Sequence, residues 1–171
     1  LHSGPLRVEP KGPVTALERT LYACARAYME SLESQADHPF LANRPDLGML
    51  YCWGVVMKRQ GHQSPHIHPS AWVSGVYYPK VPDIVETSSS FEGWLEFGAA
   101  PDNFELTMPT PTRRIKPFEG LLLLFPSYFY HRTIPFDADQ ERVSIAFDLF
   151  PKTDTSSDPT QWLTNSLVAF A

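Results

Sequence analysis

The N-terminal part of the chain carries a helical pattern of apolar residues. From residue 17 onward they recur at steps of three and four, at Leu17, Leu21, Cys24, Tyr28 and Leu32. This spacing places side chains on one face of an α-helix. Thr15 and Glu18 have the spacing of a capping box at its start. The pattern predicts one amphipathic helix over about residues 15–34, packed on a larger body and followed by a loop over 35–48.

From residue 50 the pattern changes to short runs of aromatic and β-branched residues. These runs cover residues 50–59, 72–78, 94–97, 113–118, 121–125 and 142–150. Turn residues separate them, and many short strands at this spacing are typical of an antiparallel barrel or jelly roll. Asp158 before Pro159 predicts a short helix near the C-terminus.

We therefore expect a mainly β fold, a jelly roll with an N-terminal helix packed on it. The expected organisation is a single domain over residues 1–171. An N-terminal helical extension (1–48) precedes a jelly-roll core (49–150), and a C-terminal extension (151–171) follows it.

Composition and charge exclude several classes of protein. Seventeen prolines in 171 residues would interrupt a coiled coil or a helical solenoid. The formal net charge is −5 and basic residues adjoin only in pairs, so nucleic acid is an improbable partner. The longest apolar run, 121–126, is too short to cross a bilayer. Cys24 and Cys52 lie in apolar patterns and are expected to be buried thiols rather than a disulfide. The chain begins with Leu1, which indicates a fragment or a processed product, and a cytoplasmic location is favoured.

Two histidines, His66 and His68, stand one residue apart between Pro65 and Pro69. In an extended segment, residues two apart project to the same face. Both rings are therefore expected to point into the barrel, with Ile67 pointing away. Two imidazoles this close are half of a metal site, and they suit Fe, Zn, Cu and Ni alike. The alternative is a surface or turn pair that binds nothing.

A third metal ligand and a buried cation are suggested later in the chain. His131 follows a strand-like run, although a single histidine in that position is more commonly structural. Arg142 and Ser144 share one face of the strand that begins eleven residues later. An unpaired buried guanidinium is costly, so Arg142 needs an anionic partner. That partner is either Asp148 on the same face or the carboxylate of a ligand, which the Ser144 hydroxyl would also contact.

In order and spacing, these motifs resemble the Fe(II)- and 2-oxoglutarate-dependent dioxygenases. The run Gly120–His131 looks like the strand that leads to the family's distal histidine, and Arg142-Val143-Ser144 looks like its co-substrate anchor. The run Ser74–Tyr78 looks like the strand whose tyrosine touches the co-substrate. Together with His66-Ile67-His68-Pro69, it is similar to a group of uncharacterised oxygenases within the superfamily. The similarity covers about residues 50–150.

The resemblance implies a double-stranded β-helix that binds Fe(II) and uses 2-oxoglutarate as co-substrate. The implied residues are His66, His68 and His131 as catalytic metal ligands, and Arg142, Ser144 and Tyr78 as co-substrate-binding residues. The implied reaction converts 2-oxoglutarate to succinate and CO2 and hydroxylates an unidentified substrate, a small molecule or a protein. The loops 81–92 and 101–112 are the expected substrate-contacting rims.

One position departs from the family pattern, because His68 stands where the family has a carboxylate. Three ligand sets are open. All three histidines bind, or His66 and His131 bind with water in the gap, or a carboxylate such as Glu96 completes the set. His62 is expected to be a loop residue or to lie behind the ligands.

Three other functions also fit these residues. Three histidines and a water form a catalytic zinc site of a hydrolase or isomerase. A cupin-like dioxygenase that does not use 2-oxoglutarate is a second alternative. A non-catalytic jelly-roll binding module is the third.

Overall fold

The computed structural model describes residues 1–6, 12–33, 36–42 and 44–152. The helices in this part are α1 (Pro13–Ser31), α2 (Pro39–Ala42) and α3 (Asp83–Thr87). The strands are β1 (His2–Pro5), β2 (Leu47–Met57), β3 (Gly61–His66), β4 (Val73–Lys80), β5 (Leu95–Phe97), β6 (Arg113–Ile115), β7 (Leu122–Pro126), β8 (His131–Phe136) and β9 (Arg142–Pro151).

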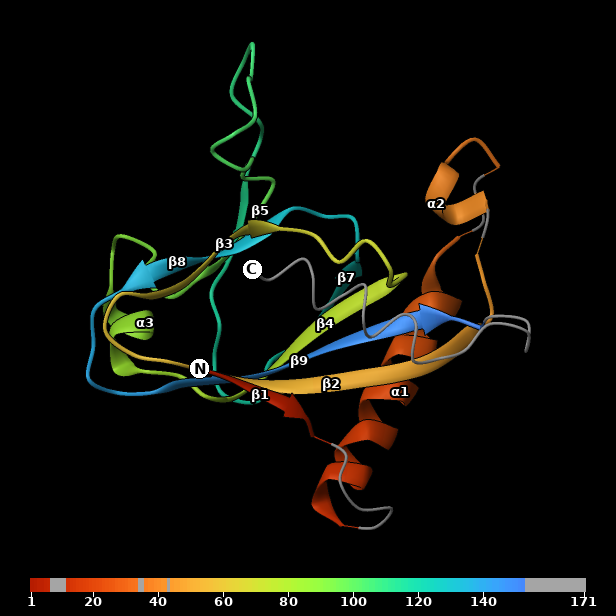
Figure 1. Cartoon of the computed structure of the whole chain (residues 1–171), viewed down its shortest axis with the longest axis horizontal. Coiled ribbons are helices and arrows are strands. Elements are labelled where there is room, and N and C mark those ends of the chain that lie inside the picture. Colours follow the sequence, from red (N-terminus) through yellow and green to blue (C-terminus); the bar gives the residue numbers. More distant parts are fainter. Residues whose placement is uncertain (7–11, 34–35, 43, 153–171) are drawn as a thin grey trace.

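The strands form two antiparallel sheets that face each other (Figure 1). The larger sheet has the order β1-β2-β9-β4-β7, and the smaller sheet has the order β3-β8-β5-β6. Consecutive strands alternate between the sheets at several points, as in a jelly roll. The mainly β fold that the sequence predicts is confirmed.

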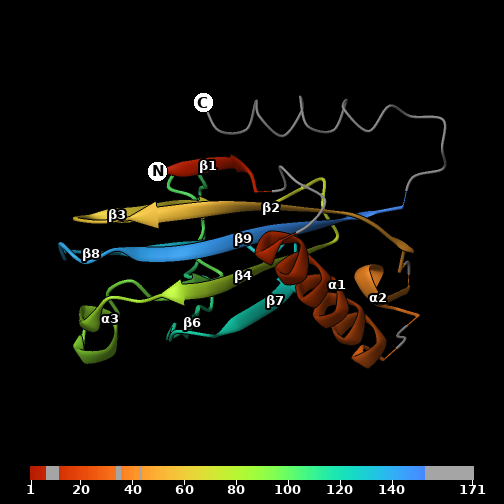
Figure 2. The same cartoon turned by 90° about the horizontal axis from the view of Figure 1, so that it is seen from below.

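Helix α1 covers the outer face of the larger sheet (Figure 2). Its buried residues Leu21, Ala25 and Met29 are spaced by four and therefore share one helical face. They pack against outward-facing side chains of the sheet, among them Phe147 and Leu149. The predicted packing of an N-terminal helix on the barrel is confirmed, and apolar burial on this side leaves the opposite face of the strands for the interior.

Strand β9 shows the alternation that the sequence predicts. Phe147 and Leu149 face α1, whereas Arg142, Ser144 and Ala146 line the space between the sheets. On β4, Gly75 lies opposite Phe147, and a methyl group at Gly75 would lie 2.2 Å from the Phe147 ring. Glycine is therefore required here so that the Phe147 ring can pack against the backbone.

The start of α1 differs from the prediction. The helix begins at Pro13 after Gly12, and no side chain caps it, so the predicted capping box at Thr15 and Glu18 is wrong. Proline at the first helical position needs no hydrogen bond for its nitrogen and already has a helical φ. The helix ends at Ser31, and the predicted loop over 35–48 contains α2 and the first residues of β2.

Other predictions were incomplete. Strands β1, β3 and β8 and helix α3 were not predicted as regular elements, and the helix expected after Asp158 lies outside the described residues. Both cysteines are free; Cys52 is buried, but Cys24 is only half-buried. Burial raises the pKa of the Cys52 thiol to about 12. Within the described residues, no helix has both the length and the apolar composition that crossing a membrane requires.

Candidate metal centre

His66, His68 and His131 meet in the space between the two sheets. One ligand nitrogen from each lies within 4.8 Å of the others. The ring centroids are 4.3 Å apart for His66 and His131, 5.2 Å for His66 and His68, and 5.1 Å for His68 and His131. Nitrogens that bind one ion through bonds of about 2.1 Å at octahedral or tetrahedral angles are about 3.0–3.4 Å apart. The three rings are therefore near enough to share one ion after small rotations of the side chains.

The strand register explains why residues distant in the chain meet. His66 on β3 is the direct cross-strand partner of His131 on β8, so their side chains leave the sheet side by side. His68 follows just beyond the end of β3. Its backbone N–H donates to the carbonyl of Ser127 at 3.0 Å, which holds this segment against the end of β7.

Hydrogen bonds at Nδ1 orient all three rings. Nδ1 of His66 donates to the carbonyl of Ser64 at 2.8 Å, and Nδ1 of His131 donates to that of Phe129 at 2.9 Å. Nδ1 of His68 donates to Asp148 Oδ1 at 2.6 Å. A proton placed on Nδ1 leaves Nε2 with its lone pair, which is the form that binds a metal.

Burial favours the neutral form of two of the rings, His66 and His131. Removal from water lowers the pKa of His66, and it lowers the pKa of His131 to about 3, with the neighbouring imidazoles contributing to the second shift. A proton would therefore not compete for the ring nitrogens of His66 and His131 near neutral pH. Three imidazoles oriented in this way fit a divalent ion of the Fe, Zn, Cu or Ni type, and the donor set alone does not distinguish among them.

Arg142 lies in the same cavity and is almost completely buried, with 2% of its surface exposed. Its Nε donates to the carbonyl of Gly93 at 3.2 Å, and Nη2 lies 3.4 Å from the hydroxyl of Tyr78. The guanidinium also stacks over the Tyr78 ring, 4.9 Å from its centroid. Among residues 1–6, 12–33, 36–42 and 44–152, no carboxylate lies within ion-pair distance of Arg142. Burial lowers the pKa of this guanidinium, while Tyr78 opposes the shift.

The cavity that holds these groups contains all six predicted site residues. Tyr78 is fully buried and Ser144 nearly so, and burial raises the pKa of the Tyr78 phenol. The remaining lining includes Ala146, which strand alternation places on the face of Arg142, and residues that sequence reasoning missed, namely Trp53, Val55, Gln63, Gly75, Val76, Leu95, Phe125 and Thr133. Strand alternation could have identified Thr133, since it lies two residues after His131 on the same strand.

Two carboxylates do not have the roles that the sequence left open for them, Asp148 as the partner of Arg142 and Glu96 as a metal ligand. Asp148 bonds to His68 and to the Ser74 hydroxyl, so it is not the partner of Arg142. Glu96 is 1% exposed and accepts from two arginine Nε atoms, at 2.7 Å from Arg114 and 2.6 Å from Arg132. Glu96 does not belong to the group of potential ligands around the three histidines.

His62 also lies apart from the three clustered histidines. It stands on β3, but its side chain is exposed, and its Nδ1 lies 2.9 Å from the carbonyl of Gln60. His62 therefore shares a strand with His66 but does not belong to the group of three histidines.

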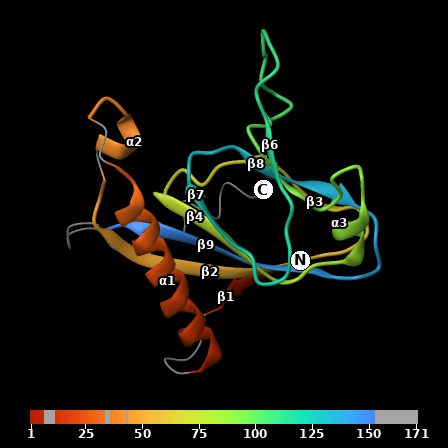
Figure 3. The ribbon, with the colours of Figure 1, turned by 180° about the vertical axis from the view of Figure 1, so that it is seen from behind.

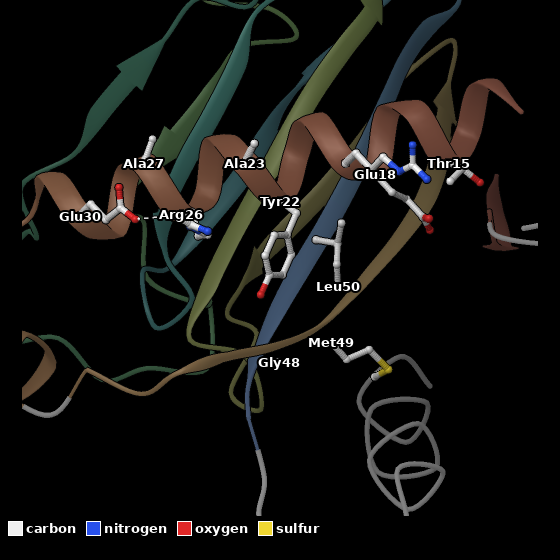
Figure 4. A pocket seen from close by; sticks show the side chains of 11 residues that line it. Thr15, Glu18, Tyr22, Ala23, Arg26, Ala27, Glu30, Gly48, Met49 and Leu50 are labelled. Carbon is white, nitrogen blue, oxygen red and sulfur yellow. Dashed lines mark hydrogen bonds and ion pairs between the residues drawn. The ribbon is translucent and has the colours of Figure 1, made fainter. Parts of the chain in front are cut away.

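A larger hollow of about 640 Å³ lies elsewhere, between α1 and the start of β2 (Figure 4). Glu18, Tyr22, Arg26 and Glu30 line its helical side. The Tyr22 hydroxyl donates to the carbonyl of Leu47, and Arg26 pairs with Glu30. None of the predicted site residues lies there, so this hollow is not the candidate site.

The segment between β5 and β6 projects beyond the two sheets (Figure 3). Thr110 bonds to the carbonyl of Gly98 at the base of this arm, and the preceding Phe97 ring lies 6.1 Å from the His131 ring. Phe104, Leu106 and Met108 on the arm are 46%, 49% and 71% exposed. The arm therefore carries apolar side chains into solvent from a base that adjoins the three histidines.

Solved structures with the same fold include three bacterial proteins. HygX from Streptomyces hygroscopicus, with nickel and 2-oxoglutarate bound, gives a TM-score of 0.59 at 16% identity, over 92% of this chain and 74% of its own. A Pseudomonas putida prolyl-4-hydroxylase gives 0.54 at 18% identity, over 90% and 71%. AviO1 from Streptomyces viridochromogenes gives 0.54 at 13% identity, over 92% and 68%. At these identities the likeness establishes the fold.

The sequence itself identifies the family. No curated protein matches the chain. The profile of a family described as "Putative 2OG-Fe(II) oxygenase" matches residues 51–148, which is more than half of the chain and includes every predicted site residue. The chain therefore belongs to the 2OG-Fe(II) oxygenases, the enzymes that depend on Fe(II) and 2-oxoglutarate.

Proposed function

We propose that His66, His68 and His131 hold the Fe(II) of this oxygenase and that the enzyme hydroxylates its substrate. The proposal assigns His68 to the position of the family's carboxylate. The proximity of the three ligand nitrogens supports it, as does the shared tautomer that their Nδ1 partners impose.

The single observation that carries the co-substrate assignment is the buried guanidinium of Arg142. A charge in the interior is normally paired, because its desolvation costs several kcal/mol. In the described part of the chain Arg142 has only a carbonyl, a phenol and a thioether as polar neighbours. A dicarboxylate that entered the cavity would supply the missing anion, and guanidinium and carboxylate match each other in a two-point hydrogen bond.

The other cavity residues would act on 2-oxoglutarate as follows. Arg142 would bind the carboxylate far from the metal, and the hydroxyls of Tyr78 and Ser144 would donate further hydrogen bonds to it. Leu95 and Phe125 contribute apolar walls that exclude water from the site. The bound Fe(II) and 2-oxoglutarate supply the oxidising chemistry, and the protein supplies position and surroundings.

The substrate has to reach the metal from outside the buried cavity. We propose the arm between β5 and β6 as part of its binding surface, because the base of the arm adjoins His131 and its side chains are apolar and exposed. Replacing Leu106 and Met108 by serine is expected to weaken substrate binding without changing the affinity for 2-oxoglutarate.

The test is the conversion of 2-oxoglutarate to succinate by Fe(II)-loaded protein in the absence of any other substrate. The proposal predicts slow, iron-dependent succinate formation that His131→Ala abolishes. The exposed histidine of the same sheet gives a matched control, so His62→Ala is expected to behave like the wild type. Succinate formation at the same rate in both variants would contradict the proposed ligands.

A further inference from the structure

His68 differs from the other two rings in what holds its Nδ1. His66 and His131 each donate to the backbone carbonyl two residues earlier, whereas His68 donates to a carboxylate. The bond to Asp148 Oδ1 is 2.6 Å long, and the side chains of His68 and Asp148 are 10% and 13% exposed. A carboxylate thus lies one hydrogen bond behind the ring that stands in the place of the family's carboxylate ligand.

The fold holds this carboxylate firmly. Asp148 on β9 is the direct cross-strand partner of Ser74 on β4, and the Ser74 hydroxyl donates to the same Oδ1 at 2.6 Å. Ser74 Oγ also lies 2.9 Å from Ser127 Oγ, and the Ser127 carbonyl accepts the backbone N–H of His68. The backbone and the ring of His68 are therefore both tied to one buried polar group of three side chains.

We infer that Asp148 is a positioning residue for the metal centre, which acts on the ion through His68. The inference rests on the proposed role of His68 as a ligand. Asp148 holds the proton of His68 on Nδ1 and fixes the plane of the ring, so that Nε2 faces the other two donors. Its negative charge also increases the electron density of the imidazole, as carboxylates behind metal-bound histidines do.

This role accounts for the replaced ligand. An imidazole in place of a carboxylate makes the ligand set one unit less negative. Asp148 places one negative charge behind His68, so the charge is near the ion although Asp148 occupies no coordination position. Within the described residues, the ion pair of Asp148 is with His68 alone. Arg142 on the same strand is directed to Gly93 and Tyr78 instead.

The experiment titrates Asp148→Asn and the wild type with Co(II) under anaerobic conditions. Calorimetry measures the affinity, and visible absorption reports the ligand environment of the ion. An asparagine oxygen can still accept from His68 and Ser74, so this substitution removes the charge while keeping an acceptor. The matched control is Glu96→Gln, which neutralises another buried carboxylate that faces two arginines outside the cluster. The expected result is a loss of Co(II) affinity of about 10- to 100-fold for Asp148→Asn, with a changed absorption spectrum, and wild-type values for Glu96→Gln.

Two further variants make the result decisive. Ser74→Ala removes one of the bonds that hold Asp148, and it is expected to weaken Co(II) binding less than Asp148→Asn does. It also provides the measurement if Asp148→Asn does not fold. A loss of less than about fivefold for Asp148→Asn, or an unchanged spectrum in a Ser74→Ala variant used in its place, overturns the inference. If His68→Ala binds Co(II) as tightly as wild type, the proposed ligand set fails. If His68→Ala loses affinity and Asp148→Asn does not, only the role of Asp148 fails.

Discussion

Replacing Arg142 by methionine separates a structural role of this residue from a binding role. The substitution removes the charge and keeps a long, flexible side chain in the cavity. The carbonyl of Gly93 loses its donor, which costs about 1–3 kcal/mol, and the contact over the Tyr78 ring is worth about 2 kcal/mol. Against these losses, the desolvation penalty of a buried ion is several kcal/mol. The terms nearly cancel, so the free energy of unfolding of the metal-free protein is expected to stay unchanged or to rise slightly.

A structural ion pair behaves differently, because removing one partner of a buried pair costs about 3–5 kcal/mol. For a domain of this size that loss lowers the Tm by about 2–4 °C per kcal/mol. The affinity for 2-oxoglutarate, in contrast, should fall strongly in Arg142→Met, although the stability of the metal-free protein does not. Loss of the guanidinium leaves a carboxylate unpaired, and about 3–5 kcal/mol corresponds to a loss of affinity of at least about 100-fold.

The assays are urea unfolding of the metal-free protein and calorimetric titration of Mn(II)-loaded protein with 2-oxoglutarate. Arg142→Lys serves as the intermediate variant, because it keeps the charge but not the two-point geometry. A large loss of stability in Arg142→Met, together with an unchanged affinity for 2-oxoglutarate, would refute the reasoning.

Three other predictions concern the metal-free protein. Its free energy of unfolding should fall from pH 7 to pH 5, because burial lowers the pKa of His66 and His131 and the unfolded chain then binds protons that the folded chain does not. Each group contributes at most about 1.4 kcal/mol per pH unit to the slope of the unfolding free energy against pH. Urea unfolding of His131→Gln should therefore give a smaller slope than wild type, and equal slopes in the two proteins would contradict this. Glu96→Gln should lower the free energy of unfolding by about 1–3 kcal/mol in the same assay, because two arginines lose a buried charged acceptor, and an unchanged midpoint would show that they do not depend on it. Gly75→Ala should destabilise by about 1–3 kcal/mol or more, because its methyl group would lie 2.2 Å from the Phe147 ring and 2.8 Å from a backbone oxygen, and a Tm equal to that of wild type would contradict the packing.

The sequence predicts those elements whose stability depends on apolar burial. Helix α1 and strands β2, β4 and β9 bury regular apolar faces against one another, so their periodicity is visible in the residues. Strand β3 reads Gly-His-Gln-Ser-Pro-His, which has no apolar alternation. It is a strand because β8 pairs with it, and a pairing between distant segments leaves no local signal.

The site was predictable to the extent that strand alternation determines it. The single residue between His66 and His68, and the parity of Arg142 and Ser144 on β9, place these side chains on the inner face. The partner of Arg142 was not predictable, because strand alternation places Asp148 on the same face and so allows an ion pair between the two. Strand register decides the matter, since it places Ser74 opposite Asp148 and leaves the carboxylate beside His68.

The claim that three imidazoles share one ion is tested most directly by the stoichiometry and affinity of Co(II) binding in four single alanine variants. We expect one ion per chain, with affinity strongly reduced in His66→Ala, His68→Ala and His131→Ala and unchanged in His62→Ala. Wild-type affinity in any of the first three variants, or an equal loss in His62→Ala, would contradict it.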